Sequence, residues 1–328
     1  MRDEPFRWGL IAPGRIAHTF AKALEAVAAG TLHAVASRNM DRARAFARQY
    51  GAIESYDVNS DLVNDPDVDA IYIASPHRFH AEQCRLALEA GKPVLCEKPL
   101  AVNAGEAREL FTLAREHDTF LMEALWTRAL PLYDKIRSWM SDGVIGEAHL
   151  LQSTFGFAFP RELQGRVFNH DLAGGALLDI GIYNVAVSQW VAESFPVEIS
   201  AIGMVGGTGV DEWVSANLRY SPTFVSQFTC SLLSRMANTF SVYGTDGSIS
   251  IDANFWGGTR ATLNREGHTT IAEAPFDANG FEYEIREAQR CIREGLIASP
   301  VIPPGVTLEN LRILDLLRQK IGLQYRFE

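Results

Sequence analysis

The 328-residue sequence lacks the features that mark several specialised classes of protein. It has no run of about 18 uncharged apolar residues and no apolar segment at its start, so neither a membrane span nor a secretory signal is predicted. It has only 4 cysteines, widely spaced and without a Cys-x-x-Cys pair. That spacing argues against a disulfide framework or a zinc site. We therefore expect reduced cysteines and a cytoplasmic protein.

Basic residues are also in short supply. The sequence has 30 Lys and Arg against 40 Asp and Glu, which gives a formal net charge of −10. Such a charge opposes nucleic acids and anionic membrane surfaces, so neither is expected as a partner. What is present is ordinary: 47% hydrophobic and 21% charged residues are typical of a globular protein, and 328 residues suffice for two domains.

The first candidate site is a turn near the N-terminus. Residues 7–12 predict a strand, and a helical pattern starts at Arg15. A helix N-terminus after such a turn presents free N–H groups to a phosphate. In the dinucleotide fingerprint G-x-G-x-x-G/A, the glycine positions read Ala12, Gly14 and Ala17, so the first glycine is missing. A plain strand-to-helix turn is the alternative to a nucleotide site. The predicted phosphate-binding residues are Ala12, Pro13, Gly14, Arg15 and Ile16.

The second predicted strand, residues 32–36, bears on the choice of cofactor. It ends at Ser37-Arg38, about 20 residues after the turn, where an NAD-binding unit places an acidic residue on the ribose. No carboxylate stands there. A hydroxyl followed by arginine suits a 2′-phosphate instead. We therefore expect NADP rather than NAD, with a solvated Arg38 as the alternative.

The third candidate site follows a later strand. The run Val94-Leu95-Cys96 predicts a buried strand that delivers Glu97 and Lys98 at its carboxyl end, before Pro99. Open α/β sheets bind ligands at that edge. A surface ion pair that closes the strand is the alternative. His77 and His80, which follow the preceding strand, lack a further ligand at metal-binding spacing, so no metal is expected.

Beyond Glu123 the pattern changes. Predicted strands now recur largely without intervening helices, which indicates a mostly antiparallel sheet. We expect an α/β protein with a doubly wound parallel domain at 1–123 and an α/β domain at 124–328. A long apolar helix, at about 172–193, places Asp179 and Tyr183 one turn apart. That pair predicts either a structural hydrogen bond or an acid/base site. The later strands are predicted at 149–157, 197–205, 213–220, 224–231 and 240–243.

Together these motifs resemble the family of glucose-fructose oxidoreductase and inositol dehydrogenase. The resemblance is carried by Gly14-Arg15-Ile16-Ala17, Ser75-Pro76-His77 with His80, Glu97-Lys98-Pro99 and Asp179-x-x-x-Tyr183, and it spans nearly the whole chain. Residues 123–128 and 174–183 are similar to the branch of dimeric dihydrodiol dehydrogenase and NADP-dependent xylose dehydrogenase. The resemblance implies a Rossmann domain, a second domain with a large open sheet, and a homodimer. Two departures are Ala12, in place of glycine, and His77, where Asn is common.

The resemblance also implies roles for individual residues. Lys98 would be the catalytic lysine, with Asp179 and Tyr183 as the pair from the second domain. Either Tyr183, assisted by cationic Lys98, or Lys98 itself would exchange the substrate proton. Further cofactor contacts are expected from Ser75, Pro76, His77, His80, Glu97, Lys98, Trp126 and Arg128. The substrate would be contacted by Lys98, Trp126, Asp179, Tyr183 and Phe281.

The function predicted from the sequence is an NADP-dependent oxidoreductase. It would transfer a hydride between nicotinamide and a carbinol or carbonyl carbon of a sugar or cyclic diol. Two alternatives remain: a noncatalytic NADP-binding sensor, because a dinucleotide fold does not by itself establish chemistry, and a glycosidase of the same family that uses the cofactor for transient oxidation.

Overall fold

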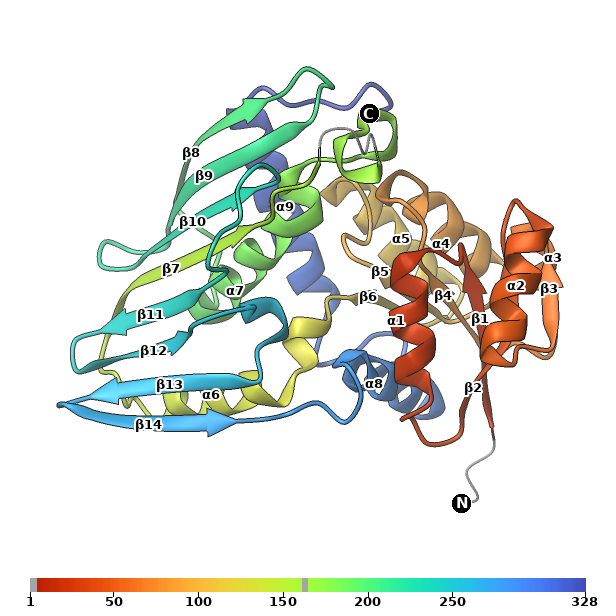
Figure 1. The fold of residues 1–328 in the computed structure, drawn as a ribbon, viewed down its shortest axis with the longest axis horizontal. Coiled ribbons are helices and arrows are strands. Elements are labelled where there is room, and N and C mark those ends of the chain that lie inside the picture. The colour runs from red at the N-terminus through yellow and green to blue at the C-terminus, as the bar shows by residue number, and fades with distance from the viewer. Residues whose placement is uncertain (1–4, 161–164) are drawn as a thin grey trace. The chain divides into compact units, whose positions relative to one another are not determined.

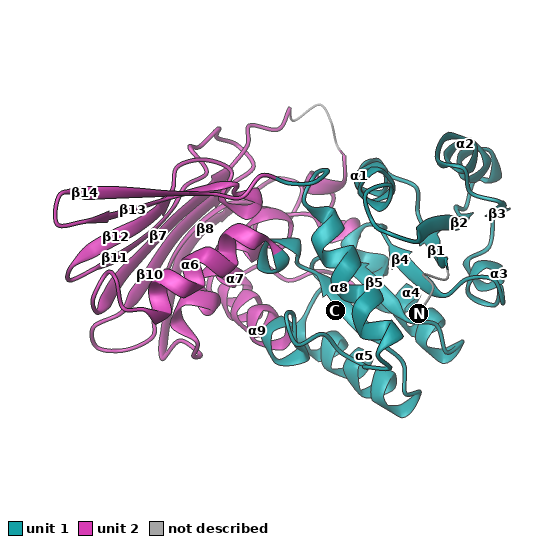
Figure 2. Ribbon diagram, turned by 90° about the horizontal axis from the view of Figure 1, so that it is seen from below, with its two compact units in different colours: residues 1–129, 276–307 teal, residues 130–275, 308–328 magenta. Residues whose placement is uncertain are grey.

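The computed structural model describes residues 5–160 and 165–328. The chain forms two compact units, which are described separately: unit 1 comprises residues 1–129 and 276–307, and unit 2 comprises residues 130–275 and 308–328 (Figure 2). These units differ from a simple division after Glu123, because the chain returns to unit 1 late in the sequence. No described helix has both the length and the hydropathy that crossing a bilayer requires.

Unit 1 contains a six-stranded sheet in the order β3-β2-β1-β4-β5-β6, with every neighbouring pair parallel (Figure 1). This is the order of a dinucleotide-binding doubly wound sheet. The residues of β4, β5 and β6 are all buried, as expected when helices cover both faces. The strands are β1 Phe6–Ile11, β2 Gly30–Ala36, β3 Glu54–Tyr56, β4 Ala70–Ile73, β5 Val94–Glu97 and β6 Leu121–Ala124.

The helices of unit 1 follow the strands, and one of them comes from far along the chain. Helix α8 (Phe281–Arg293) packs against α1 and the short turn η2 (Trp126–Ala129). Its role in unit 1 explains why the sequence pattern alone did not give the boundary. The other helical elements are α1 Arg15–Leu24, α2 Met40–Tyr50, α3 Asn59–Val63, η1 His77–Phe79, α4 His80–Glu89 and α5 Ala104–Glu116.

Unit 2 contains an eight-stranded sheet in the order β14-β13-β12-β11-β7-β10-β9-β8. All neighbouring pairs are antiparallel except β7 and β10, which are parallel. The fold class predicted from the sequence is therefore confirmed. The last three strands were not predicted. The strands are β7 Ala148–Gly156, β8 Glu198–Val205, β9 Asp211–Arg219, β10 Val225–Ser231, β11 Phe240–Gly244, β12 Gly247–Ile251, β13 Arg260–Arg265 and β14 His268–Glu273.

Helices lie against one face of this sheet. In unit 2, α6 (Pro131–Ser141) packs on β13 and β14, and α7 (Ile182–Ala192) packs on β7 and β10 (Figure 2). The last helix, α9 (Pro304–Lys320), lies mostly in unit 2. Short turns η3 (Arg166–Phe168), η4 (His170–Leu172) and η6 (Phe255–Gly257) complete the described elements.

The helix predicted near 172–193 starts later and is irregular. A π-helical segment, η5 (Leu177–Gly181), runs directly into α7. A π-helix bonds i to i+5 rather than i+4. The α-helical spacing from which a shared face was predicted for Asp179 and Tyr183 therefore does not hold across this segment. Both side chains are nevertheless buried, with 7% and 6% of their surface exposed.

Candidate functional site

The turn between β1 and α1 has the geometry that a glycine normally provides. Ala12 has φ 68°, in the left-handed region, and its carbonyl accepts a hydrogen bond from the Gly14 N–H at 2.7 Å. The missing first glycine of the fingerprint thus leaves a strained alanine in the same conformation, at about 1–2 kcal/mol for a non-glycine residue. Helix α1 begins at Arg15, and no side chain caps its first turn. Its N–H groups suit a phosphate.

Two arginines, Arg38 and Arg42, follow the carboxyl end of β2, and only Arg38 was predicted from the sequence to bind the cofactor. The Arg38 guanidinium lies over the Phe79 ring, 5.8 Å from its centroid. The Ser37 hydroxyl accepts a bond from the Asn39 N–H at 3.3 Å. Arg42, in the first turn of α2, donates to the Pro13 carbonyl at 3.4 Å. Arg42 thus touches the phosphate-binding turn and is a candidate that the sequence reading missed.

The two charged residues at the end of β5, Glu97 and Lys98, differ in burial. Glu97 is buried, with 7% of its surface exposed, and its carboxylate accepts a 2.5 Å hydrogen bond from the buried Tyr72 hydroxyl. Glu97 is therefore a core group and not half of a surface ion pair. Lys98, the next residue, is half-buried. Lys98 lies one residue beyond the end of β5, whose own residues are all buried.

Two buried side chains fix the turn that follows Lys98. His80 is fully buried and joins two main-chain carbonyls, that of Pro99 through Nδ1 at 2.7 Å and that of Ser75 through Nε2 at 2.8 Å. Glu123 accepts the Leu100 N–H at 2.9 Å and the Thr307 hydroxyl at 2.8 Å. These contacts of His80 with the main chain are structural, and its cofactor contact stays a prediction.

Buried carboxyl groups lie near the end of β5, and one of them interacts electrostatically with Lys98. Burial raises the pKa of Glu123, while its hydrogen bonds and the Lys98 charge oppose that rise. Burial also raises the pKa of Glu284 in α8, with a further contribution from Glu97, and that of Tyr72. The Lys98 charge thus favours the ionised form of Glu123, whereas burial favours the neutral form of both carboxyls. The local sequence could not show Glu284, which comes from a distant helix.

Two of the residues predicted for substrate contact lie together in unit 1. The rings of Trp126 and Phe281 are 5.1 Å apart, and Phe276 adds a third ring, 6.0 Å from Trp126. Gly280 has φ 98°, and a Cβ there would lie 2.4 Å from the Trp126 ring. The Arg128 guanidinium donates to the Val301 carbonyl at 2.8 Å. These contacts form an aromatic cluster next to η2.

In unit 2, Asp179 and Tyr183 each have an identifiable neighbour. Asp179 accepts a 2.5 Å hydrogen bond from the Arg166 guanidinium, which makes a charged pair. The Tyr183 ring lies 5.7 Å from Phe155, and Phe155 stacks on Trp256 at 4.0 Å. The sequence reading did not find Arg166, Phe155 or Trp256. The joint action of Lys98 with Asp179 and Tyr183 stays a prediction.

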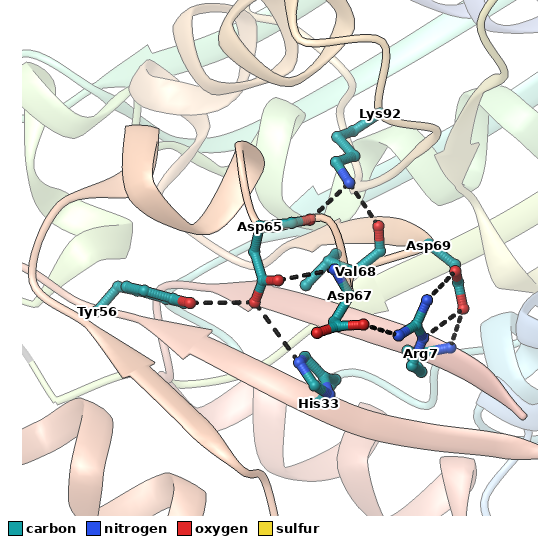
Figure 3. A network of polar contacts seen from close by, with 8 residues as sticks. All are labelled: Arg7, His33, Tyr56, Asp65, Asp67, Val68, Asp69 and Lys92. Carbon is teal, nitrogen blue, oxygen red and sulfur yellow. Dashed lines mark hydrogen bonds and ion pairs between the residues drawn. The ribbon is translucent and has the colours of Figure 1, made fainter.

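One polar cluster outside these sites contains residue types that could bind a cation (Figure 3). His33, Asp65 and Asp67 can bring ligand atoms within 4.8 Å of one another. Asp65 already accepts bonds from the Tyr56 hydroxyl at 3.1 Å and the Asp67 N–H at 2.8 Å, and His33 lies 3.5 Å from it. Asp67 pairs with Arg7. A cation would have to displace these partners, so we interpret the network as a structural cross-link.

The parallel sheet, the turn before α1 and the lysine at the end of β5 define a class, the dinucleotide-binding oxidoreductases. Comparison with known families agrees. Residues 6–125 match the oxidoreductase family with an NAD-binding Rossmann fold known as GFO/IDH/MocA, and residues 133–250 match the C-terminal domain of the same family. The chain belongs to this family.

Several relatives match over nearly their whole length. The chain is 36% identical to trans-1,2-dihydrobenzene-1,2-diol dehydrogenase of Mus musculus, covering 97% of this chain and 98% of that protein. The rabbit enzyme (Oryctolagus cuniculus) of the same name is 37% identical, covering 96% and 98%. The sequence-based prediction of a dehydrogenase or reductase acting on CH–OH groups is therefore confirmed.

Solved structures support the same fold. A 3-ketoreductase from Actinomadura kijaniata in complex with NADP and TDP-benzene superposes with a TM-score of 0.88 at 28% identity, covering 97% of this chain and 98% of that one. An aldose-aldose oxidoreductase from Caulobacter crescentus gives a TM-score of 0.89 at 21% identity over the same shares. The second likeness concerns the fold alone.

Proposed function

We propose that this protein is an NADP-dependent dehydrogenase or reductase of a sugar or cyclic diol. The observation that carries the proposal is the combination of a Rossmann sheet with Lys98 at the end of β5 and a buried Asp179–Tyr183 helix. Similarity to dihydrodiol dehydrogenases and to a sugar-nucleotide ketoreductase supports the substrate class.

In this proposal the bound nicotinamide accepts or donates the hydride, and side chains of this chain handle the proton. Oxidation of a CH–OH group releases one hydride and one proton. Lys98 donates a hydrogen bond to the substrate oxygen and stabilises the developing alkoxide. Tyr183 takes the hydroxyl proton, and returns it during reduction. Asp179, paired with Arg166, orients Tyr183.

The preference for NADP rests on the end of β2. Ser37 and Arg38 stand where an NAD-binding unit would place a carboxylate, and Arg42 lies next to the phosphate turn. A guanidinium forms strong paired bonds with a phosphate. The relative from Actinomadura kijaniata holds NADP, which supports the same choice. The turn at residues 12–16 would hold the pyrophosphate.

We further propose a cytoplasmic homodimer built on the eight-stranded sheet. Within unit 2, the described helices lie against one face, and the other face carries a hollow lined by hydroxyl and amide side chains such as Gln152, Thr154 and Asn217. Ile202 and Tyr243 are 68% and 41% exposed. Exposed apolar side chains on a sheet are typical of an interface. Sedimentation at micromolar concentration should give twice the 36.3 kDa mass of one chain.

The experiment that tests the function is a panel of aldoses, polyols and cyclic diols with NADP and, in parallel, NAD. Build-up of NADPH with one substrate class supports the proposal. Cleavage of a glycoside without net NADPH would instead make the protein a cofactor-assisted glycosidase. NADP binding without any turnover would make it a sensor.

A further inference from the structure

A buried carboxylate from a distant strand meets the start of the helix that carries Asp179 and Tyr183. Asp211, the first residue of β9, is fully buried. Its Oδ2 accepts the Leu177 N–H at 2.7 Å, and the Ala176 N–H also bonds to this carboxylate. These are among the N–H groups that a helix leaves unpaired at its N-terminus. Asp211 thus caps the helix across 34 residues of sequence.

The segment just before this helix is shaped to admit the carboxylate. Gly175 has φ 125°, and a Cβ at this position would lie 2.0 Å from Asp211 Oδ1. Only glycine therefore fits against Asp211 in this conformation. The carbonyl of the neighbouring Gly174 accepts a 2.5 Å hydrogen bond from the buried Tyr325 hydroxyl. Two distant side chains thus hold the two residues from which the helix starts.

The surroundings of Asp211 shift the pKa of its carboxyl group. Burial raises its pKa to about 7, and the helix N–H groups together with Arg318 on α9 oppose that rise. Cys230, on β10, and Tyr325 are also in electrostatic contact with it. Arg318 is itself paired with Glu328 at 2.7 Å and with Asp315 at 2.7 Å. Asp211 therefore changes charge near neutral pH.

We propose that Asp211 is a positioning residue whose carboxylate fixes the start of the π-helical segment and thereby the place of Asp179 and Tyr183. Asp179 lies two residues after Leu177, inside the segment that Asp211 caps. A carboxylate at a helix N-terminus is stabilised by both the hydrogen bonds and the helix dipole. Loss of the cap lets the first turn fray, and Asp179 moves with it.

This inference rests on the proposed function for the roles of Asp179 and Tyr183, but the capping itself can be measured without turnover. The variants are Asp211→Ala, which removes the acceptor, and Asp211→Asn, which keeps an oxygen but no charge. Asp142→Asn, at an exposed position at the end of α6, is the matched control. Hydrogen–deuterium exchange of the peptide 176–183 reports the helix start, and NADP titration reports unit 1.

Asp211→Ala should speed exchange of this peptide about 10-fold and lower kcat by a similar factor, in line with the loss of a helix cap. NADP affinity should stay unchanged in every variant. In the wild type, kcat should fall as the pH drops through about 7, where Asp211 takes up a proton. Asp211→Asn, which like the protonated acid has an oxygen but no charge, should show the low kcat of the acidic side at every pH, so that the limb disappears, which a purely structural residue would not cause.

The outcomes separate this inference from the proposed function. A wild type that neither binds NADP nor turns over any substrate contradicts the proposed function. Hydrogen–deuterium exchange of the peptide 176–183 then tests the capping by itself. If Asp211→Ala exchanges and turns over as the wild type does, the positioning role is overturned. An acidic limb that Asp211→Asn leaves in place also overturns it. Should Asp211→Ala fail to fold, the Asp211→Asn comparison decides.

Discussion

The two units hold their candidate catalytic residues by different means. Lys98 stands at the carboxyl end of a buried parallel strand, and the turn after it is held by His80 and Glu123 from neighbouring strands and helices of unit 1. Asp179 sits on a π-helical segment held by Arg166 and by the Asp211 cap. The hydrogen bonds of the sheet fix the position of a residue at the end of a strand. The start of the helix, in contrast, depends on a few buried charges. We expect the second arrangement to be more sensitive to pH.

The largest effect should come from removing the groups that meet the substrate. Tyr183→Phe deletes the proton-exchanging hydroxyl and keeps the ring, so kcat should fall about 10²- to 10⁴-fold while NADP affinity barely moves. Lys98→Met should be at least as damaging, because it also removes a donor to the alkoxide. Steady-state kinetics and cofactor titration measure both.

Two variants control for that comparison. Tyr220→Phe removes a buried hydroxyl that has no hydrogen-bond partner among the described residues, and Lys320→Met removes an exposed charge. Both should keep normal turnover. If Tyr183→Phe keeps nearly normal turnover and Lys98→Met has none, Lys98 exchanges the proton and the two roles are reversed.

The next largest effect is the pH dependence of stability in unit 2. The pKa of Asp211 is raised from 3.8 to about 7 in the folded state. Between these values the folded protein holds a proton that the unfolded chain has lost, so stability falls as pH rises from about 4 to 7. The full difference is about 4 kcal/mol.

Urea unfolding of the wild type and Asp211→Asn at pH 5 and pH 8 measures this term. The amide has no charge to bury, so Asp211→Asn should lose less stability between the two pH values than the wild type does. Glu123 and Glu284 have pKa values shifted in the same direction, and they titrate alike in both proteins. Equal losses in the two proteins would show that Asp211 has an ordinary pKa.

The next prediction concerns the ion pair between Asp179 and Arg166 in unit 2. Arg166→Ala leaves the buried Asp179 carboxylate without its 2.5 Å partner, and a hydrogen bond to a charged group contributes about 1.5–3 kcal/mol. We expect kcat to fall about 10- to 100-fold, with partial recovery in Arg166→Lys. Arg219→Ala, which breaks an exposed pair with Glu198, should change little. Unchanged kinetics in Arg166→Ala would exclude a role for the pair.

In unit 1, cofactor choice should respond to a single arginine. Arg38→Ala should weaken NADP binding about 10- to 100-fold and leave NAD binding nearly unchanged, because only NADP carries the 2′-phosphate. Arg44→Ala, at an exposed position on α2, serves as the control. Isothermal titration with both cofactors measures the preference. Equal loss for NAD and NADP would place Arg38 on the adenine rather than on the phosphate.

The smallest expected effect lies in the phosphate turn. Ala12→Gly relieves a left-handed φ of 68° and adds the flexibility of glycine, so the net gain should be about 1 kcal/mol or less. Ala45→Gly, at an exposed site inside α2, should instead destabilise the protein by about 1 kcal/mol. Thermal unfolding of both variants checks the sign. Destabilisation by Ala12→Gly would mean that the turn is not strained.

The sequence predicted most of what is set by local patterns. The apolar run before Glu97-Lys98 marked a strand, and Pro13-Gly14 marked the turn, because both signals lie within a few neighbouring residues. Arg166 and Asp211 could not be found in this way. They reach Asp179 and Leu177 across 13 and 34 residues, and no local pattern encodes such a contact. The π-helical segment also has no sequence signal of its own.

The missed strands have a related cause. β14 is largely exposed, so the alternation that marks a half-buried strand is weak there. β12 and β13 do alternate, but each is short and buries only two apolar side chains. Their pairing is set by the hairpins β12–β13 and β13–β14. The boundary of unit 1 depended on α8, whose contact with Trp126 links positions far apart in the chain.

The return of the chain to unit 1 has a consequence for biosynthesis. Residues 1–129 leave the ribosome well before α8, which ends at Arg293. At synthesis rates of about 5–20 residues per second, the nascent first sheet waits roughly ten to thirty seconds for its last helix. During that time the surfaces of Trp126 and α1 that α8 later covers are open to water and to chaperones. The eight-stranded sheet, in contrast, is synthesised in one continuous stretch and can form before unit 1 is complete.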